Sequence, residues 1–61
     1  MNRQREWGYD IYRLPDDKKM ATKDGMDSES LADYEAKWHK ANLESRYPGA
    51  KFYHEAEWYY I

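Results

Sequence analysis

Neither cysteine nor valine occurs in this sequence of 61 residues, and there are only three glycines and two prolines. Without cysteine the chain can form no disulfide and no thiolate metal site, and it suits a reducing compartment. No apolar run approaches the roughly 20 residues of a membrane span, and the charged start of the chain is unlike a secretory signal. We therefore expect a soluble cytoplasmic protein without membrane contact, located in the host cytoplasm if a phage encodes it.

Aliphatic side chains are scarce, whereas aromatic side chains are abundant. Leu, Ile and Phe together number six, and three Trp and seven Tyr accompany the single Phe. A chain this short buries only about 60% of its unfolded surface, so its core has room for about half of these eleven rings. Because Tyr and Trp dominate interface hot spots, the surplus indicates a binding surface. The alternative for any single Tyr is a half-buried ring with its hydroxyl in water.

The charges nearly balance, with a net charge of −2. Residues 1–25 carry six basic and five acidic side chains, and residues 26–61 carry four basic and seven acidic ones. The two parts therefore sum to +1 and −3. Neither is basic enough to favour nucleic acid as a partner, and neither is a saturated acidic surface that would imitate DNA.

Two segments alternate with a period of two, which is typical of half-buried strands. Within residues 6–14, Trp7, Tyr9 and Ile11 share one side, and Pro15 ends the strand because it has no amide proton to donate. Residues 50–61 have a core-like face formed by Ala50, Phe52, His54, Ala56, Trp58 and Tyr60. Their other face carries Lys51, Tyr53, Glu55, Glu57, Tyr59 and Ile61.

Residues 15–26 are polar and contain two turn signals, Pro-Asp-Asp and Asp-Gly. They predict a loop or a short edge strand over residues 18–22, whose lysines would suit an unpaired edge. A helix is predicted over residues 27–46, with Asp27 as the N-cap. Pro48 and Gly49 follow and stop it.

The predicted helix has two uncharged stripes on nearly opposite sides. The larger stripe predicts the core face and consists of Leu31, Tyr34, Trp38, Ala41 and Ser45. The smaller stripe is expected to be solvated and consists of Ala32, Ala36, Leu43 and Tyr47.

The order of strand, loop, helix and strand predicts one α+β domain over residues 1–61. We expect a small two-layer domain in which one helix packs on a two- or three-stranded antiparallel sheet. Residues 1–5 are expected to be flexible.

No constellation of residues favours catalysis or metal binding. On a strand Glu55 points away from His54, so His54, Glu55 and Glu57 cannot chelate one ion together. The glycines are isolated and form no phosphate cradle. We therefore expect no enzyme, no cofactor and no metal.

These features predict a small module that binds another protein. The residues expected to contact that partner are Tyr12, Tyr53, Glu55, Glu57, Tyr59 and Ile61. A binder of single-stranded nucleic acid and a homodimeric structural protein remain as alternatives. Small domains without disulfides or metals are frequent among phage and mobile-element inhibitors, which favours an inhibitor or modulator of a host protein complex.

Overall fold

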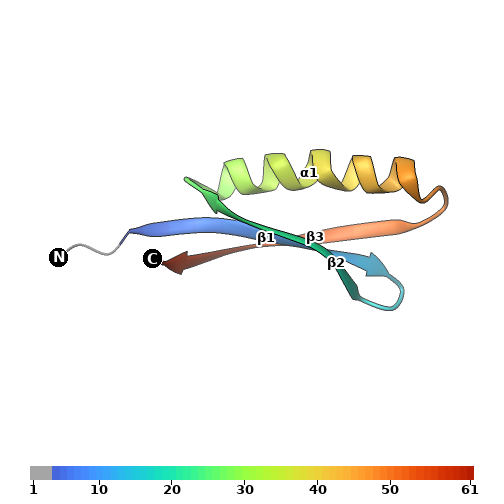
Figure 1. Ribbon diagram of the computed structural model, residues 1–61, viewed down its shortest axis with the longest axis horizontal. Helices are drawn as coiled ribbons and strands as arrows, with labels where there is room; N and C mark the ends of the chain where they lie inside the picture. The colour runs from blue at the N-terminus through green and yellow to red at the C-terminus, as the bar shows by residue number, and fades with distance from the viewer. Residues whose placement is uncertain (1–3) are drawn as a thin grey trace.

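One helix covers one face of a three-stranded antiparallel sheet in the computed structural model, which describes residues 4–61 (Figure 1). The elements are β1 (Arg5–Leu14), β2 (Lys18–Met26), α1 (Glu29–Arg46) and β3 (Lys51–Tyr60). The strand order in the sheet is β2-β1-β3. The first strand, β1, therefore pairs with the last strand, β3. The predicted α+β architecture is confirmed.

The alternation of β1 determines which face of the sheet meets the helix. Tyr9 is 3% exposed and Ile11 is fully buried, and Trp7 packs beside them. β3 pairs with β1 along its whole length, with Trp58 opposite Trp7 and His54 opposite Ile11. The predicted core faces are therefore confirmed beneath α1, where Phe52 and Ala56 of β3 pack against the core. The prediction is wrong for the end of β3, because Trp58 is 47% exposed and Tyr60 is 53% exposed.

Strand β2 is longer than the expected short edge strand over residues 18–22, and the Asp24-Gly25 pair lies inside it rather than in a turn. Its pairing with β1 shifts in register between Trp7 and Tyr9, next to Gly8. A Cβ atom on Gly8 would lie 2.6 Å from Asp24 Oδ1 and 2.6 Å from the Lys23 carbonyl oxygen. The missing side chain of Gly8 thus allows β2 to pass close to the central strand.

The N-cap of helix α1 lies one residue later than predicted. Ser28, not Asp27, is the N-cap, because its hydroxyl accepts a hydrogen bond of 3.1 Å from the Leu31 amide. The helix ends at Arg46 as predicted. Gly49 then adopts a φ of +91°, a left-handed conformation that suits glycine in the turn toward β3.

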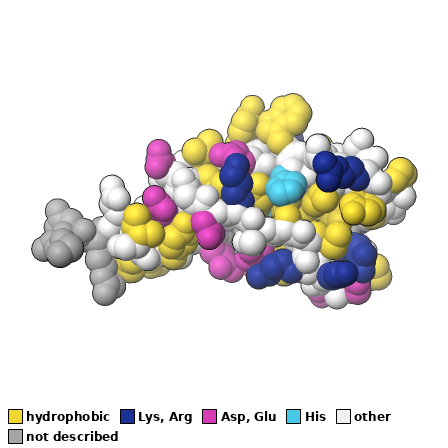
Figure 2. Space-filling view, viewed as in Figure 1, with side chains coloured by type: hydrophobic (Ala, Val, Ile, Leu, Met, Phe, Trp, Pro, Cys, Tyr) yellow, Lys and Arg dark blue, Asp and Glu magenta, His cyan; other side chains and the backbone are white. Residues whose placement is uncertain are grey.

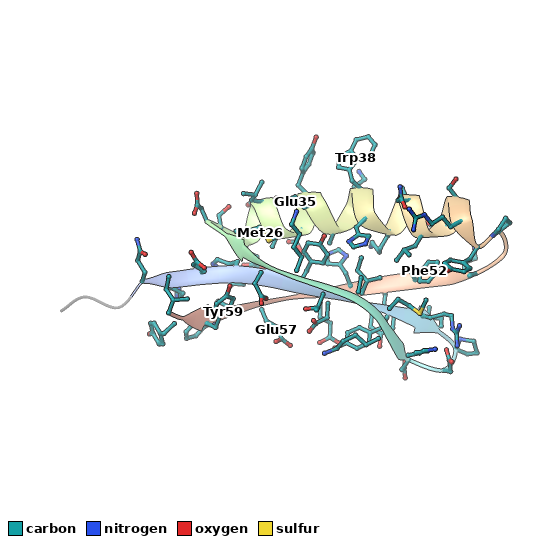
Figure 3. All side chains as sticks on the ribbon, in the orientation of Figure 1. Met26, Glu35, Trp38, Phe52, Glu57 and Tyr59 are labelled. Atoms are coloured by element: carbon teal, nitrogen blue, oxygen red, sulfur yellow. The ribbon has the colours of Figure 1, made fainter. Side chains whose placement is uncertain are left out.

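The prediction of the buried helix face is wrong. Ala32 and Ala36 are fully buried against the sheet, whereas Tyr34 is 60% exposed and Trp38 is 63% exposed. Figure 3 shows Trp38 pointing away from the sheet. The sheet already supplies large side chains such as Tyr9, so small residues on the helix fill the remaining space and let the two layers approach.

The core of the described residues is small and consists of Tyr9, Ile11, Met26, Ala32, Ala36 and Leu43. The molecule measures 48 × 20 × 13 Å, and the sheet extends past the first turn of α1 near both chain ends (Figure 1). The expected flexibility of residues 1–5 concerns mostly residues 1–3, which lie outside the described residues, while Arg5 is the first residue of β1. Across residues 4–61, α1 is not apolar enough for a helix that crosses a membrane.

Candidate functional site: the uncovered sheet face

The face of the sheet opposite α1, here called the open face, is covered by no other element of residues 4–61. The alternation of β1 and β3 places its side chains, and Figure 3 shows Glu57 and Tyr59 on this side. The open face contains the tyrosines Tyr12, Tyr53 and Tyr59. It combines aromatic and acidic side chains over one continuous surface.

Tyr12 and Tyr53 form the centre of the open face. They are directly opposite in the pairing of β1 with β3, and their rings stack with centroids 5.2 Å apart and an interplanar angle of 23°. The Tyr53 hydroxyl donates a hydrogen bond of 2.9 Å to Asp17 Oδ1 in the turn between β1 and β2. This bond raises the pKa of Tyr53, and desolvation adds to the effect. The stacked pair is therefore held in place by the turn.

Tyr59 forms the second aromatic position of the open face, close to the chain ends. Its hydroxyl accepts a hydrogen bond of 3.0 Å from the Gly25 amide and donates one of 3.4 Å to Glu6 Oε1. The ring thus joins β3 to β1 and β2. Desolvation raises the pKa of Tyr59, with smaller contributions from nearby carboxylates that include Asp24.

Carboxylates outnumber lysines on the open face. The carboxylates are those of Glu6, Asp10, Asp17, Asp24, Glu55 and Glu57, and the lysines are Lys19 and Lys51. Six acids against two bases give this face −4, so the remainder of the sequence carries +2, which together make the net −2. The negative charge of the protein is therefore concentrated on one side.

The acids surround the stacked tyrosines closely enough to affect them. Desolvation raises the pKa of Tyr12, and the charges of Asp10, Glu55 and Glu57 add to this rise. Lys19 opposes it, because its Nζ lies 6.0 Å from the centroid of the Tyr12 ring. The same ammonium lies 3.8 Å from Asp10 Oδ1. The open face already holds one cation against its tyrosine and carboxylate groups.

The structure brings together five of the six residues expected to contact a partner. Tyr12, Tyr53, Glu55, Glu57 and Tyr59 all lie on the open face. Ile61 follows the end of β3 and is 62% exposed, and its amide donates to the Gln4 carbonyl oxygen at 3.0 Å. It lies at the end of this surface rather than among the tyrosines.

His54 lies on the helix side of the sheet, apart from Glu55 and Glu57. Its Nε2 is 2.9 Å from Asp33 Oδ1 on α1. In the range 4–61, no group of three or more acidic or histidine side chains is arranged to hold a metal ion, and no pocket is present.

Sequence reasoning missed two exposed aromatic side chains on α1, Tyr34 and Trp38. Tyr34 and Trp38 pack edge to face on its outer side with centroids 6.3 Å apart. Figure 2 shows hydrophobic side chains projecting there. The sequence signal that could have found these two rings is the opposite stripe with Ala32 and Ala36. A sheet that bears large side chains favours small ones on the helix side that faces it, so Tyr34 and Trp38 then face outward.

Comparison with known proteins found no matching family model, no matching curated protein and no matching solved structure. We therefore interpret the open face from its own residues and contacts.

Proposed function

We propose that this protein is a small protein-binding module whose open face docks an arginine-rich surface of another protein. The observation that carries this proposal is the stacked pair Tyr12 and Tyr53 within a surface of charge −4. Aromatic rings and carboxylates on a surface without a pocket support docking of a macromolecule rather than enclosure of a small ligand.

Arginine is the basic side chain that best matches these groups. Its planar guanidinium stacks on tyrosine rings and donates hydrogen bonds to two carboxylate oxygens at once, whereas the lysine ammonium is a compact charge. Lys19 above Tyr12 and beside Asp10 illustrates the electrostatic part of such a contact. A partner guanidinium placed between Tyr53 and Glu55 would add stacking and paired hydrogen bonds.

Nucleic acid fits this surface less well. Phosphate contacts provide most of the affinity in protein complexes with nucleic acids. The tyrosines that could stack on bases share their face with Glu55 and Glu57, which repel phosphates. The charge of the open face therefore supports a protein partner.

A module of this size acts on its partner by covering part of its surface. If the covered surface is the one through which a host protein joins its complex, the module inhibits or modulates that complex. We include this inhibitory role, of the kind used by phage and mobile elements, in the proposed function.

The open face can be tested with peptides. The 15N-labelled protein is titrated at low salt with an arginine-rich peptide and a lysine-rich peptide of equal charge, and amide shifts are followed by NMR. We expect shifts centred on Tyr12 and Tyr53, with the arginine peptide binding more tightly. Replacing two acids, as Glu55→Gln with Glu57→Gln, should weaken binding about fivefold, because each exposed charge contributes modestly.

The matched control removes two carboxylates at the start of α1, as Asp27→Asn with Glu29→Gln. It should leave peptide binding unchanged, although the net charge changes equally. Equal weakening in both variants, or shifts confined to α1, would contradict the proposal. Quenching of Trp fluorescence by a single-stranded oligonucleotide at low salt, without peptide binding, would favour a nucleic-acid function instead.

A further inference from the structure

The outer side of α1 is an uncharged surface bounded by charges on both sides. Its members are spaced three or four positions apart and all are exposed: Leu31, Tyr34, Trp38, Ala41 and Ser45. We call this surface the outer ridge. None of these side chains covers the sheet, so the outer ridge has no structural role in the core of the described residues.

The side chains of the outer ridge become smaller toward the C-terminal end of the helix. Tyr34 and Trp38 are large, whereas Ala41 and Ser45, one and two turns further on, are small. Two antiparallel copies of such a surface are complementary to each other, because the large half of one faces the small half of the other. We propose that the outer ridge joins two copies of this chain into an antiparallel, two-fold symmetric dimer.

The large and small residues place the symmetry axis at Ala41. Around this axis, Trp38 of one copy inserts between Ala41 and Ser45 of the second copy, as a knob enters a hole. The two Ala41 side chains meet at the crossing point and allow the helices to approach closely.

The charges beside the outer ridge agree with the same axis. In an antiparallel pair, each side of one helix meets the same side of the other. Lys37, four positions before the axis, therefore meets Glu44, three positions after it. On the other side, Glu35, which is already paired with Lys23 at 2.8 Å within the monomer, meets Arg46. Both contacts pair opposite charges, and each occurs twice in the dimer.

An axis at Trp38 is disfavoured on the same grounds. It would place Asp33 opposite Glu44 of the second copy and Lys37 opposite Lys40, so like charges would meet. It would also place the two Trp38 rings against each other at the crossing point. Charge and size therefore select the axis at Ala41, and the open face remains free for a partner in this dimer.

Sedimentation velocity over a range of protein concentrations tests the dimer, and a charge exchange tests its geometry. Lys37 and Glu44 suit this exchange because they form no ion pair with any other residue in the range 4–61. Lys37→Glu and Glu44→Lys should each weaken dimerisation about tenfold by placing like charges together, and the double variant should restore it. Trp38→Ala should weaken it at least about tenfold, as expected for a central aromatic anchor.

The control is Lys51→Glu on β3, which reverses a charge on the opposite side and should leave dimerisation unchanged. Circular dichroism of each variant verifies that the monomer remains folded. A monomer at all concentrations up to the millimolar range would overturn the proposal. A dimer that persists unchanged in Trp38→Ala, or a double charge variant as weak as the single ones, would overturn it as well.

Discussion

The hydroxyl of Tyr9 and Nδ1 of His39 lie 2.9 Å apart, and the two rings meet edge to face with centroids 5.8 Å apart. This contact joins the middle of the central strand to the inner side of α1. Because Tyr9 is only 3% exposed, rotation of the helix would leave its buried hydroxyl without this partner. The hydrogen bond thus helps to select which side of the helix faces the sheet.

The orientation of α1 predicts different effects for its two leucines. Leu43 is 8% exposed and lies in the core, whereas Leu31 is 39% exposed. Leu43→Ala should lower the free energy of unfolding by about 2–4 kcal/mol, since it removes buried methyl groups and leaves a cavity. Leu31→Ala should lower it by less than about 1 kcal/mol. Urea unfolding of both variants measures this, and a larger loss for Leu31→Ala would contradict the orientation.

The helix N-cap predicts a second contrast between neighbours. Ser28→Ala removes the hydroxyl that accepts from the Leu31 amide and should lower the free energy of unfolding by about 1 kcal/mol. Asp27→Ala, one residue earlier, should change it by no more than about 0.5 kcal/mol. Thermal unfolding followed by circular dichroism compares the two. Equal losses would show that Ser28 is not the dominant cap.

The close approach of β2 at Gly8 predicts a local effect. Gly8→Ala places a Cβ against the Lys23 carbonyl oxygen and Asp24, so β2 must shift, at a cost of about 1–3 kcal/mol. Amide hydrogen exchange should accelerate throughout β2. Gly49→Ala serves as the control, because it strains a left-handed turn but meets no atom within 4 Å. It should reduce stability without selectively loosening β2, and unchanged exchange in Gly8→Ala would contradict the close approach.

The tyrosines predict a loss of stability in alkaline solution. Burial or hydrogen bonding raises the pKa of Tyr9, Tyr12, Tyr53 and Tyr59 in the folded chain. A phenol with a raised pKa holds its proton more tightly when folded, so its stabilising contribution is complete below the unfolded value of about 10. Above that value the unfolded chain loses protons first, and the free energy of unfolding falls.

Phenolate absorbance against pH measures this effect in native buffer and in denaturant. The native curve should lie at higher pH, and urea midpoints should decline as pH rises above about 10. Coincident curves in the two solvents would contradict the raised pKa values. Tyr53→Phe removes one of these phenols and should reduce the difference between the curves.

Several features could be predicted from the sequence because they depend on near neighbours. Alternation in residues 6–14 and 50–61 identified β1 and β3, and it identified their core faces in the part of the sheet beneath α1. Pro48 and Gly49 located the end of α1. The same alternation placed Tyr53 and Glu55 on a face away from the core, so most of the candidate site could be predicted from the sequence alone.

Other features depend on contacts between distant residues. Asp24 and Gly25 are a turn signal locally, yet pairing with β1 holds them in β2, where Gly8 gives them space. Such a contact joins positions far apart in the chain, and propensity does not report it. Tertiary pairing overrode the local preference here.

The sequence by itself determined the helix, the two aromatic strands and the residues of the open face, because periodicity and turn chemistry act over a few positions. Only the tertiary structure decided which stripe of α1 is buried. Both stripes are uncharged, and the apparent advantage of Trp38 over Ala36 disappears once Tyr9 and Phe52 fill the space above the sheet. The choice depends on the volume left between two layers, which no single segment contains.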